Sequence, residues 1–429
     1  MPKTVLLVLA ALSACGGDDE VECRFDIDCP VLERCASGRC EPVQQTARDA
    51  AVGWDASAGL DAATERDSGA DAGIDASVPG ACELVLASDV SVDVGQGTDD
   101  APVLVRSGID LFGVVYRAPD RVMARFLDPD GDTIGEARTL AEGASPNVDL
   151  ALTADGAGML LAAWVDSDAR IHGATADGVG VEQIDLTEPA TGTYHPALAW
   201  TGAGFVLAWG DLSIDGETEQ IWTLTLDSSG RPLENQPVRH VTPGRARLPA
   251  LAAGDDTGVP IAWQDMRSGT ALPYAGLRAA DGSIEETPVS EAQLARAAAL
   301  VRTSFGVFAS WVEPAVDGGE AVLHVTRGED GVLTDHEIER AAELDPRTSI
   351  AWDERMLLVG WQTGAGDAAQ ARVDAVSLDF QSRSMLDIGL GTAAPRVAAD
   401  DAYRGVVWVD ASTGEVRFGA LACALDPEK

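Results

Sequence analysis

An aromatic residue recurs at nearly constant spacing through most of the chain. Consecutive members are 48, 45, 54, 48, 50 and 47 residues apart, and they are Tyr116, Trp164, Trp209, Trp263, Trp311, Trp361 and Trp408. Units of this length with several short strands each are typical of β-propeller blades. Solenoids built from helix pairs share the period, but these units lack a long amphipathic stretch and are rich in glycine and β-formers. The repeat therefore predicts an all-β fold, a seven-bladed β-propeller.

One unit shows how four strands fit into a blade. Residues 196–200 and the wholly apolar 205–209 predict strands one and two, since a strand covered on both faces is apolar throughout. Residues 220–226 predict strand three, and strand four is expected directly after the turn at 227–230. In the first unit, Asp128-Pro-Asp130-Gly-Asp132 has some features of a calcium loop, but its glycine comes too early, so a hairpin turn is the better interpretation.

The two ends of the repeat region complement each other. The last unit has three strands and ends at Cys423, whereas an orphan strand starting at Cys82 precedes the first unit. Because an antiparallel fourth strand begins beside the end of the third, we expect Cys82 to lie next to Cys423 and to form a disulfide with it. Closing a loop of about 340 residues stabilises by roughly 5–6 kcal/mol at most. Residues 81–429 are thus assigned to a propeller closed by its N- and C-terminal strands.

The N-terminus has the order of an export signal. Lys3, an apolar run over 5–12 and small residues follow one another in residues 1–14. The segment Leu12-Ser13-Ala14-Cys15 resembles the bacterial lipoprotein signal, the alternative being an ordinary export signal followed by a thiol. The resemblance implies cleavage before Cys15, lipidation of that cysteine with palmitate-like chains, and a lipidated N-terminus over 15–22. Gly16 in place of aspartate implies an outer-membrane lipoprotein whose body faces the periplasm or the cell surface.

Four cysteines follow within eighteen residues, and an exported chain meets oxidising conditions. Residues 23–40 resemble the small cysteine-rich modules of secreted proteins, and two disulfides of undetermined connectivity are expected among Cys23, Cys29, Cys35 and Cys40. A zinc site is the alternative, although the Cys-x2-Cys pairs typical of zinc do not occur. Residues 41–80 are Asp, Ala, Gly and Ser with few large apolar side chains, which predicts a disordered linker.

Charge and hydropathy exclude two classes of partner or location. The formal net charge of −40 opposes nucleic acid as a partner. No apolar run reaches the roughly 18–20 residues of a membrane-spanning helix.

The repeat also resembles a known group of proteins. Its proline, Gly-x-Gly, apolar-Ala-Trp-x-Asp and later Leu-Asp-x-x-Gly are similar to the repeats of large secreted lipoproteins of myxobacteria and related bacteria. The resemblance covers most of residues 95–424. It implies a propeller fold and export, and it implies no particular activity.

Two sets of charged residues are the candidate ligand-face residues. Carboxylates stand two residues after the aromatic, at the end of strand two, and the start of strand one carries arginines. The two sets are Asp166, Asp211, Asp265, Glu313 and Asp410, and Arg247, Arg347 and Arg396. Such arginines could bind a carboxylate or phosphate. We favour the alternative, in which they pair with the carboxylates in a structural ring between blades.

No motif for catalysis, a metal or a cofactor is present. The five histidines are isolated, and neither a Gly-x-Ser-x-Gly elbow nor a phosphate loop occurs. We therefore predict a lipid-anchored, non-catalytic binding or scaffold module without a cofactor or metal, held on the membrane through Cys15, whose partner is an envelope protein or a polysaccharide. The alternative is a carbohydrate-active enzyme, a lyase or glycosidase, that uses carboxylates on the channel face.

Overall fold

The computed structural model divides the chain into two units, residues 1–71 and 72–429. It describes residues 33–36, 39–42, 82–93, 101–108, 110–143, 150–166, 170–177, 180–187, 194–212, 219–233, 237–255, 257–290, 298–315, 319–329, 332–364 and 369–424. The predicted signal at 1–14, the lipidation site Cys15, residues 15–22, Cys23, Cys29 and residues 43–80 of the predicted linker lie outside these ranges.

The described part of the first unit is a two-stranded antiparallel sheet. Strand β1 (Glu33–Ala36) pairs with β2 (Arg39–Pro42), and their register places Cys35 opposite Cys40. Strand β2 runs two residues past the predicted end of the cysteine-rich module at position 40.

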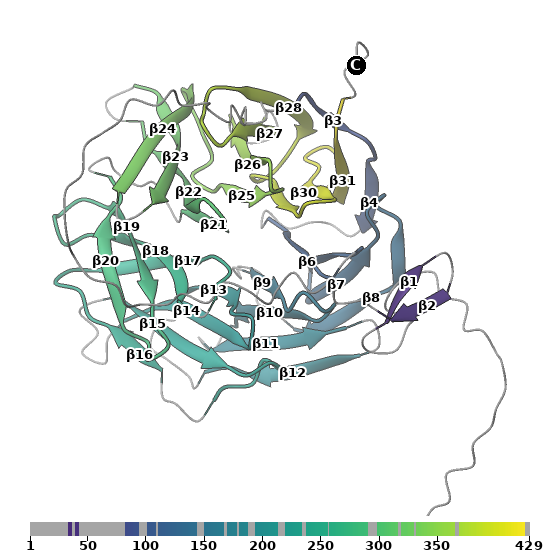
Figure 1. Ribbon diagram of the computed structural model, residues 1–429, viewed down its shortest axis with the longest axis horizontal. Coiled ribbons are helices and arrows are strands. Elements are labelled where there is room, and N and C mark those ends of the chain that lie inside the picture. Colours follow the sequence, from purple (N-terminus) through teal and green to yellow (C-terminus); the bar gives the residue numbers. More distant parts are fainter. Residues whose placement is uncertain are drawn as a thin grey trace, which may run out of the picture. The chain divides into compact units, whose positions relative to one another are not determined.

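The second unit is a seven-bladed β-propeller (Figure 1) whose blades are antiparallel sheets. In blades one to six the strands follow chain order, whereas blade seven also contains strands from the start of the unit. The innermost strands are β5 (Val103–Arg106), β9 (Leu150–Ala154), β13 (Tyr194–Trp200), β17 (Ala246–Leu251), β21 (Ala299–Thr303), β25 (Ser349–Trp352) and β29 (Arg396–Ala399). The second strands are β6 (Phe112–Ala118), β10 (Leu160–Val165), β14 (Phe205–Leu212), β18 (Val259–Asp265), β22 (Gly306–Glu313), β26 (Met356–Thr363) and β30 (Arg404–Val409). We number the blades one to seven in this order.

Two further strands complete each blade. The third strands are β7 (Arg121–Leu127), β11 (Ile171–Ala176), β15 (Glu219–Leu226), β19 (Leu272–Arg278), β23 (Ala321–Glu329), β27 (Gln370–Ser377) and β31 (Val416–Cys423). The outermost strands of blades one to six are β8 (Thr133–Glu142), β12 (Val181–Asp185), β16 (Val238–His240), β20 (Ile284–Pro288), β24 (Val332–Ala341) and β28 (Arg383–Leu390). The seven predicted blades are thus confirmed.

The repeated aromatic residue packs between blades. Trp164 of blade two belongs to one buried cluster with Val115 and Phe126 of blade one. Trp311, Trp361 and Trp408 are likewise at most 2 % exposed. A large ring at the same position in each second strand therefore fills the space toward the preceding blade, which explains why the sequence period equals one blade.

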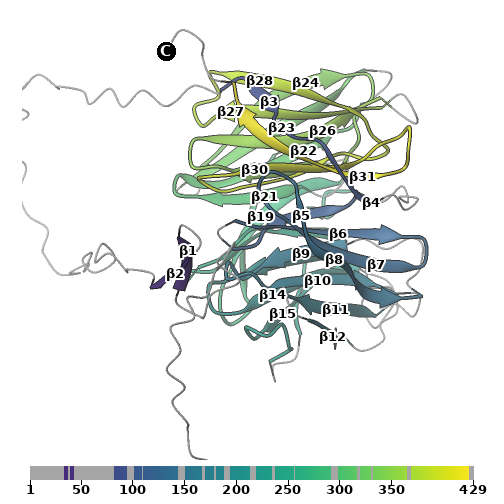
Figure 2. The same cartoon turned by 90° about the vertical axis from the view of Figure 1, so that its right-hand side faces the viewer.

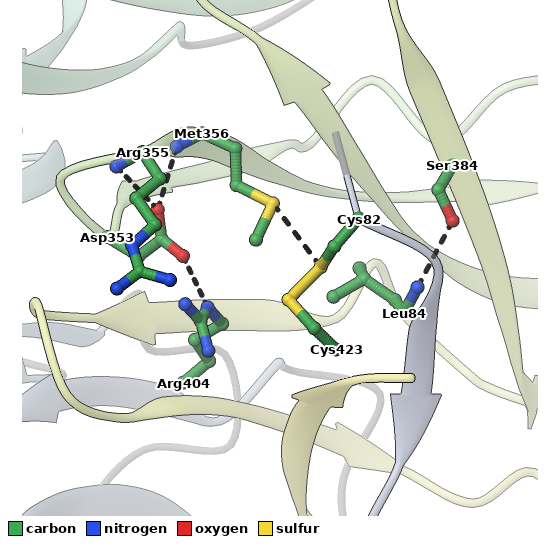
Figure 3. The surroundings of a disulfide bond; sticks show 8 residues. All are labelled: Cys82, Leu84, Asp353, Arg355, Met356, Ser384, Arg404 and Cys423. Atoms are coloured by element: carbon green, nitrogen blue, oxygen red, sulfur yellow. Dashed lines mark hydrogen bonds and ion pairs between the residues drawn. A yellow bond between two sulfur atoms is a disulfide. The ribbon is translucent and has the colours of Figure 1, made fainter. Parts of the chain in front are cut away.

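The ring is closed as predicted. In blade seven, β3 (Leu84–Leu86) pairs with the end of β31, and β4 (Val90–Asp93) pairs with its start, as the turned view also shows (Figure 2). Cys82 and Cys423 form a disulfide with their Cα atoms 5.5 Å apart, and Cys82 Sγ lies 3.8 Å from Met356 Sδ (Figure 3). The closure confirms the pairing expected from the orphan strand.

The start of strand four in blade three differs from the prediction. Strand β16 begins at Val238 rather than directly after Gly230, with an isolated bridge between Leu226 and Pro232 in between. Contacts with β15 nevertheless begin directly after the turn, because Leu233 N donates to Thr225 O at 3.1 Å. Pro232 and Pro237 have no N–H to donate to the ladder, which makes the pairing near them irregular.

The Asp128 segment is a turn. Asp128 Oδ1 accepts hydrogen bonds from the backbone N–H groups of Asp130 and Asp132, at 3.1 and 2.8 Å. Gly131 at its tip has a φ of 94°. The interpretation as a hairpin turn is confirmed.

Within the described ranges, no helix has the length and apolar character to span a membrane.

Candidate functional site

The innermost strands of all seven blades surround a central channel. A cavity of about 280 Å³ in this channel is lined mainly by aliphatic side chains such as Leu104, Leu152 and Leu198. Its polar lining comes from blades three, six and seven, namely His195, Arg347, Thr348, Ser349 and Arg396. Most of the side chains that line the channel are therefore apolar, and two of the predicted arginines are among the others.

Two innermost strands are bulged where they line the channel. His195 and Leu248 have φ angles of 53° and 55°, in the left-handed region that non-glycine residues rarely adopt, and each precedes a proline. At both places the ladder to the second strand shifts register. Such bulges re-aim neighbouring side chains, and Arg247, next to the second bulge, lines a different cavity from Arg347.

We call that second cavity the mouth pocket. It lies where the innermost strands begin and the second strands end in blades four to six. It has a volume of about 700 Å³. Its polar lining is Arg247, Gln264, Glu343, Asp345, Gln362 and Thr392, and its apolar lining includes Val312, Pro314, Ala321, Leu344 and Pro346.

Polar groups in the wall of the mouth pocket keep hydrogen-bonding capacity. Gln362 is 3 % exposed and donates from Nε2 to Gly391 O at 2.6 Å, while its Oε1 has no partner within the described residues. Thr392 Oγ1 likewise has no hydrogen-bond partner within the described residues. Arg247 donates from Nε to Gln264 Oε1. The pocket thus combines a guanidinium donor with amide and hydroxyl groups.

The predicted carboxylate Asp265 is bound inside its own blade. It is fully buried and accepts hydrogen bonds from Trp263 Nε1 at 3.2 Å and from Arg267 Nη2 at 2.7 Å. Arg267 also holds Glu286, with Nη1 to Oε1 at 2.5 Å, and hydrogen bonds to both carboxylates raise the pKa of its guanidinium. Arg267 likewise lowers the pKa of Glu286. All four carboxylate oxygens of Asp265 and Glu286 accept hydrogen bonds, whereas Arg267 Nε has no partner within the described residues.

Glu313 contacts a histidine. His324 Nε2 lies 3.3 Å from Glu313 Oε2, and Nδ1 lies 2.9 Å from Asp335 Oδ2. Burial favours the neutral ring of His324, but the hydrogen bonds and charges of Asp335 and Glu313 outweigh it and raise the pKa of the imidazole.

The other three predicted carboxylates lie in separate blades. Asp166 Oδ2 is 3.9 Å from His172 Nε2, and Asp211 is 8 % exposed, opposite Gln220 in the ladder. Asp410 accepts from Ser412 N and Oγ at 2.7 and 2.6 Å, as the first residue of a turn. The structure therefore does not bring the five carboxylates together.

Arg347 pairs with a carboxylate that is not among the predicted ones. It donates from Nη2 to Asp345 Oδ2 at 2.8 Å and from Nε to Oδ1 at 3.0 Å. Arg396 donates to Thr348 O of the preceding blade at 2.5 Å. These contacts join the two arginines to a carboxylate two residues away and to a backbone carbonyl.

Sequence reasoning missed most of the polar lining of the mouth pocket. Gln264 and Gln362 directly follow the repeated aromatic, so their position in the repeat could have indicated them. Asp345 and Thr392 lie in connections between blades, where the repeat carries no pattern. Within the described ranges, no cluster of three or more His, Cys, Asp or Glu side chains is placed to hold a metal ion.

Comparison with known proteins supports the fold alone. No family model matches the chain, and neither does a curated protein. A crystal structure of a protein of unknown function from Dyadobacter fermentans is 14 % identical, with a TM-score of 0.50 over 79 % of this chain and 99 % of that one. The β-propeller domain of Cps50 (Swd1) from Myceliophteria thermophila is 12 % identical, with a TM-score of 0.49 over 77 % and 99 % of the two chains. The WD40 domain of Toxoplasma gondii coronin is 12 % identical, with a TM-score of 0.48 over 82 % and 90 %.

Proposed function

We propose that this protein is an exported, lipid-anchored binding module that holds a hydroxyl-rich ligand, an envelope polysaccharide, in the mouth pocket without transforming it. The observation that carries the proposal is the mixed lining of that pocket. Arg247 supplies donors, Glu343 and Asp345 supply acceptors, and Val312 and Leu344 supply apolar wall. A sugar hydroxyl both donates and accepts hydrogen bonds, so it can use both kinds of group.

Charge favours a neutral polysaccharide over a strongly anionic partner. The chain carries a net charge of −40, which repels polyanions at long range. Inside the pocket, Asp345 is paired with Arg347, so the local charges largely cancel.

The electrostatics of the pocket favour binding over catalysis. A glycosidase needs one carboxyl group that stays protonated near neutral pH. Burial favours the protonated form of Asp345, but the hydrogen bonds and charge of Arg347 hold its pKa below the usual value. Asp374, whose pKa is raised by burial, is fully enclosed beneath Arg383 and Trp361. The alternative of a carbohydrate-active enzyme therefore has weaker support.

Affinity electrophoresis tests the binding proposal. The full chain is run through gels that contain neutral polysaccharides (dextran, galactomannan) or acidic ones (alginate). We expect a neutral polymer to retard the wild type, and Arg247→Ala to weaken the retardation at least tenfold. Arg231→Ala is the matched control, because Arg231 is exposed and pairs with Glu182 away from the pocket. Equal retardation of Arg247→Ala and wild type would contradict the proposal, as would new reducing ends that disappear in Asp345→Asn.

The membrane anchor has a separate test. The lipoprotein signal at Leu12–Cys15 supports lipidation of Cys15, and its Gly16 supports the outer membrane. We expect the wild type in the outer-membrane fraction and Cys15→Ser in the soluble fraction. An N-terminal peptide of the wild type without added acyl mass would overturn the anchor while leaving the pocket proposal intact.

A further inference from the structure

Within the described residues, the interface between blades four and five has the smallest buried apolar core, followed by the adjacent interface between blades three and four, whose two clusters have five and three members. Eleven buried hydrophobic residues form the core between blades five and six, and thirteen form the core between blades one and two. Between blades four and five, the corresponding cluster within the described residues has three members, Ala262, Ala298 and Trp311. Two of these three residues are alanines, so this cluster buries less apolar volume than the larger ones do.

A crevice of about 610 Å³ occupies this interface. Its walls are strands β18, β19 and β20 of blade four and β21, β22 and β23 of blade five, which are neighbours in Figure 1. Ala275 and Ala309 line it from opposite sides, together with Leu277, Leu300 and Val307. Leu277 is 39 % exposed, so the crevice is open to solvent along an apolar wall.

One end of the crevice is held by polar contacts between the blades. Arg302 of blade five lies 2.6 Å from Asp255 Oδ2 and donates to Gly258 O at 3.2 Å, both in blade four. Deeper inside, Thr326 accepts from Trp311 Nε1 at 3.0 Å and donates to Asp335 at 3.0 Å. These polar groups have partners, and two other polar lining residues, Glu285 and Thr287, lie on the exposed outermost strand β20. The wall between these two ends is mainly apolar.

We propose that the blade 4–5 crevice is a second binding site, distinct from the mouth pocket, for a neutral and mainly apolar small molecule. Its volume falls in the range of roughly 300–1,000 Å³ typical of small-molecule sites. Because the buried apolar cluster between these blades is small, an apolar ligand would complete the packing at this interface.

Fluorescence titration with N-phenyl-1-naphthylamine, a neutral apolar probe, tests this site on the full chain. We expect saturable binding to the wild type and at least tenfold weaker binding to Ala309→Leu and to Ala275→Leu, which fill the crevice from opposite walls. Ala203→Leu, an exposed substitution in a turn of blade three, is the matched control and should bind like the wild type. Circular dichroism identifies which variants are folded, and a single folded crevice variant is sufficient. Absence of saturable binding to the wild type would overturn the proposal, and so would unchanged affinity in a folded crevice variant.

Discussion

Trp311 stacks on His324, with ring centroids 4.2 Å apart and ring planes inclined by 6°. The two residues face each other across β22 and β23, and carboxylates of Glu313 and Asp335 lie on either side of the imidazole. Other blades repeat this arrangement of an aromatic ring, a basic side chain and a carboxylate across their strands. Arg372 lies over Trp361 and binds Asp387, and His172 stacks on Trp164 near Asp185.

The contacts of His324 predict a pH-dependent stability. The pKa of His324 is raised in the folded state. Its contribution to the free energy of unfolding is therefore complete below the unfolded-state pKa near 6.5, and it is lost as pH rises through the folded-state pKa. We expect His324→Gln to destabilise by about 1.5–3 kcal/mol at pH 5.5, as for hydrogen bonds to charged groups. The difference from wild type should shrink toward pH 8.5. Urea unfolding at both pH values measures it, and a difference independent of pH would contradict the assignment of a charged imidazole.

Arg278 links blades three and four through neutral partners. It is 4 % exposed and donates to the hydroxyls of Thr223 and Thr225, both at 3.0 Å. Burial lowers the pKa of its guanidinium. We expect Arg278→Ala to cost about 2–4 kcal/mol, because it leaves a cavity, and Arg278→Met to cost less than about 1.5 kcal/mol, because it keeps the volume and removes a buried charge. Chemical denaturation of both variants checks the order, and a larger cost for methionine would show that the charge itself stabilises the interface.

Ser349 connects the innermost strands of blades six and seven. Its hydroxyl donates to Pro395 O at 2.8 Å and accepts from Val397 N at 3.2 Å. Ser349→Ala leaves both buried backbone groups without this partner, so we expect a loss of about 1–3 kcal/mol in the free energy of unfolding. The exposed Ser268→Ala serves as the control and should change stability by less than about 0.5 kcal/mol. Thermal and urea unfolding compare the two, and equal stability would mean that water or a shifted strand replaces the hydroxyl.

The fold was predictable because its signals are local. The aromatic in the second strand of each blade and the turns at 128–132 and 227–230 each depend on a few neighbouring residues. The pairing of Cys82 with Cys423, 341 residues apart, followed instead from the strand that the last blade lacks. The partners of the charged groups were not predictable in the same way, since they depend on register. The bulges at His195 and Leu248 shift the start of two innermost strands, so arginines that look equivalent in the sequence enter different cavities.

The disulfide predicts a measurable stabilisation of the ring. Cys82 and Cys423 are separated by 341 residues, and removal of a disulfide from a folded domain typically costs about 2–5 kcal/mol. We expect the double variant Cys82→Ser/Cys423→Ser to unfold at a lower urea concentration by a corresponding amount. Addition of a reductant should lower the urea midpoint of the wild type. The double variant lacks this disulfide, so its midpoint should not change.

Peptide mapping of the exported chain, alkylated and digested without reduction, tests the ring closure directly. The account predicts one cross-linked species that joins the peptide of Cys82 to the peptide of Cys423, with neither cysteine alkylated. Alkylation of either residue, or a bond from either one to Cys23, Cys29, Cys35 or Cys40, would contradict closure of the propeller by its terminal strands.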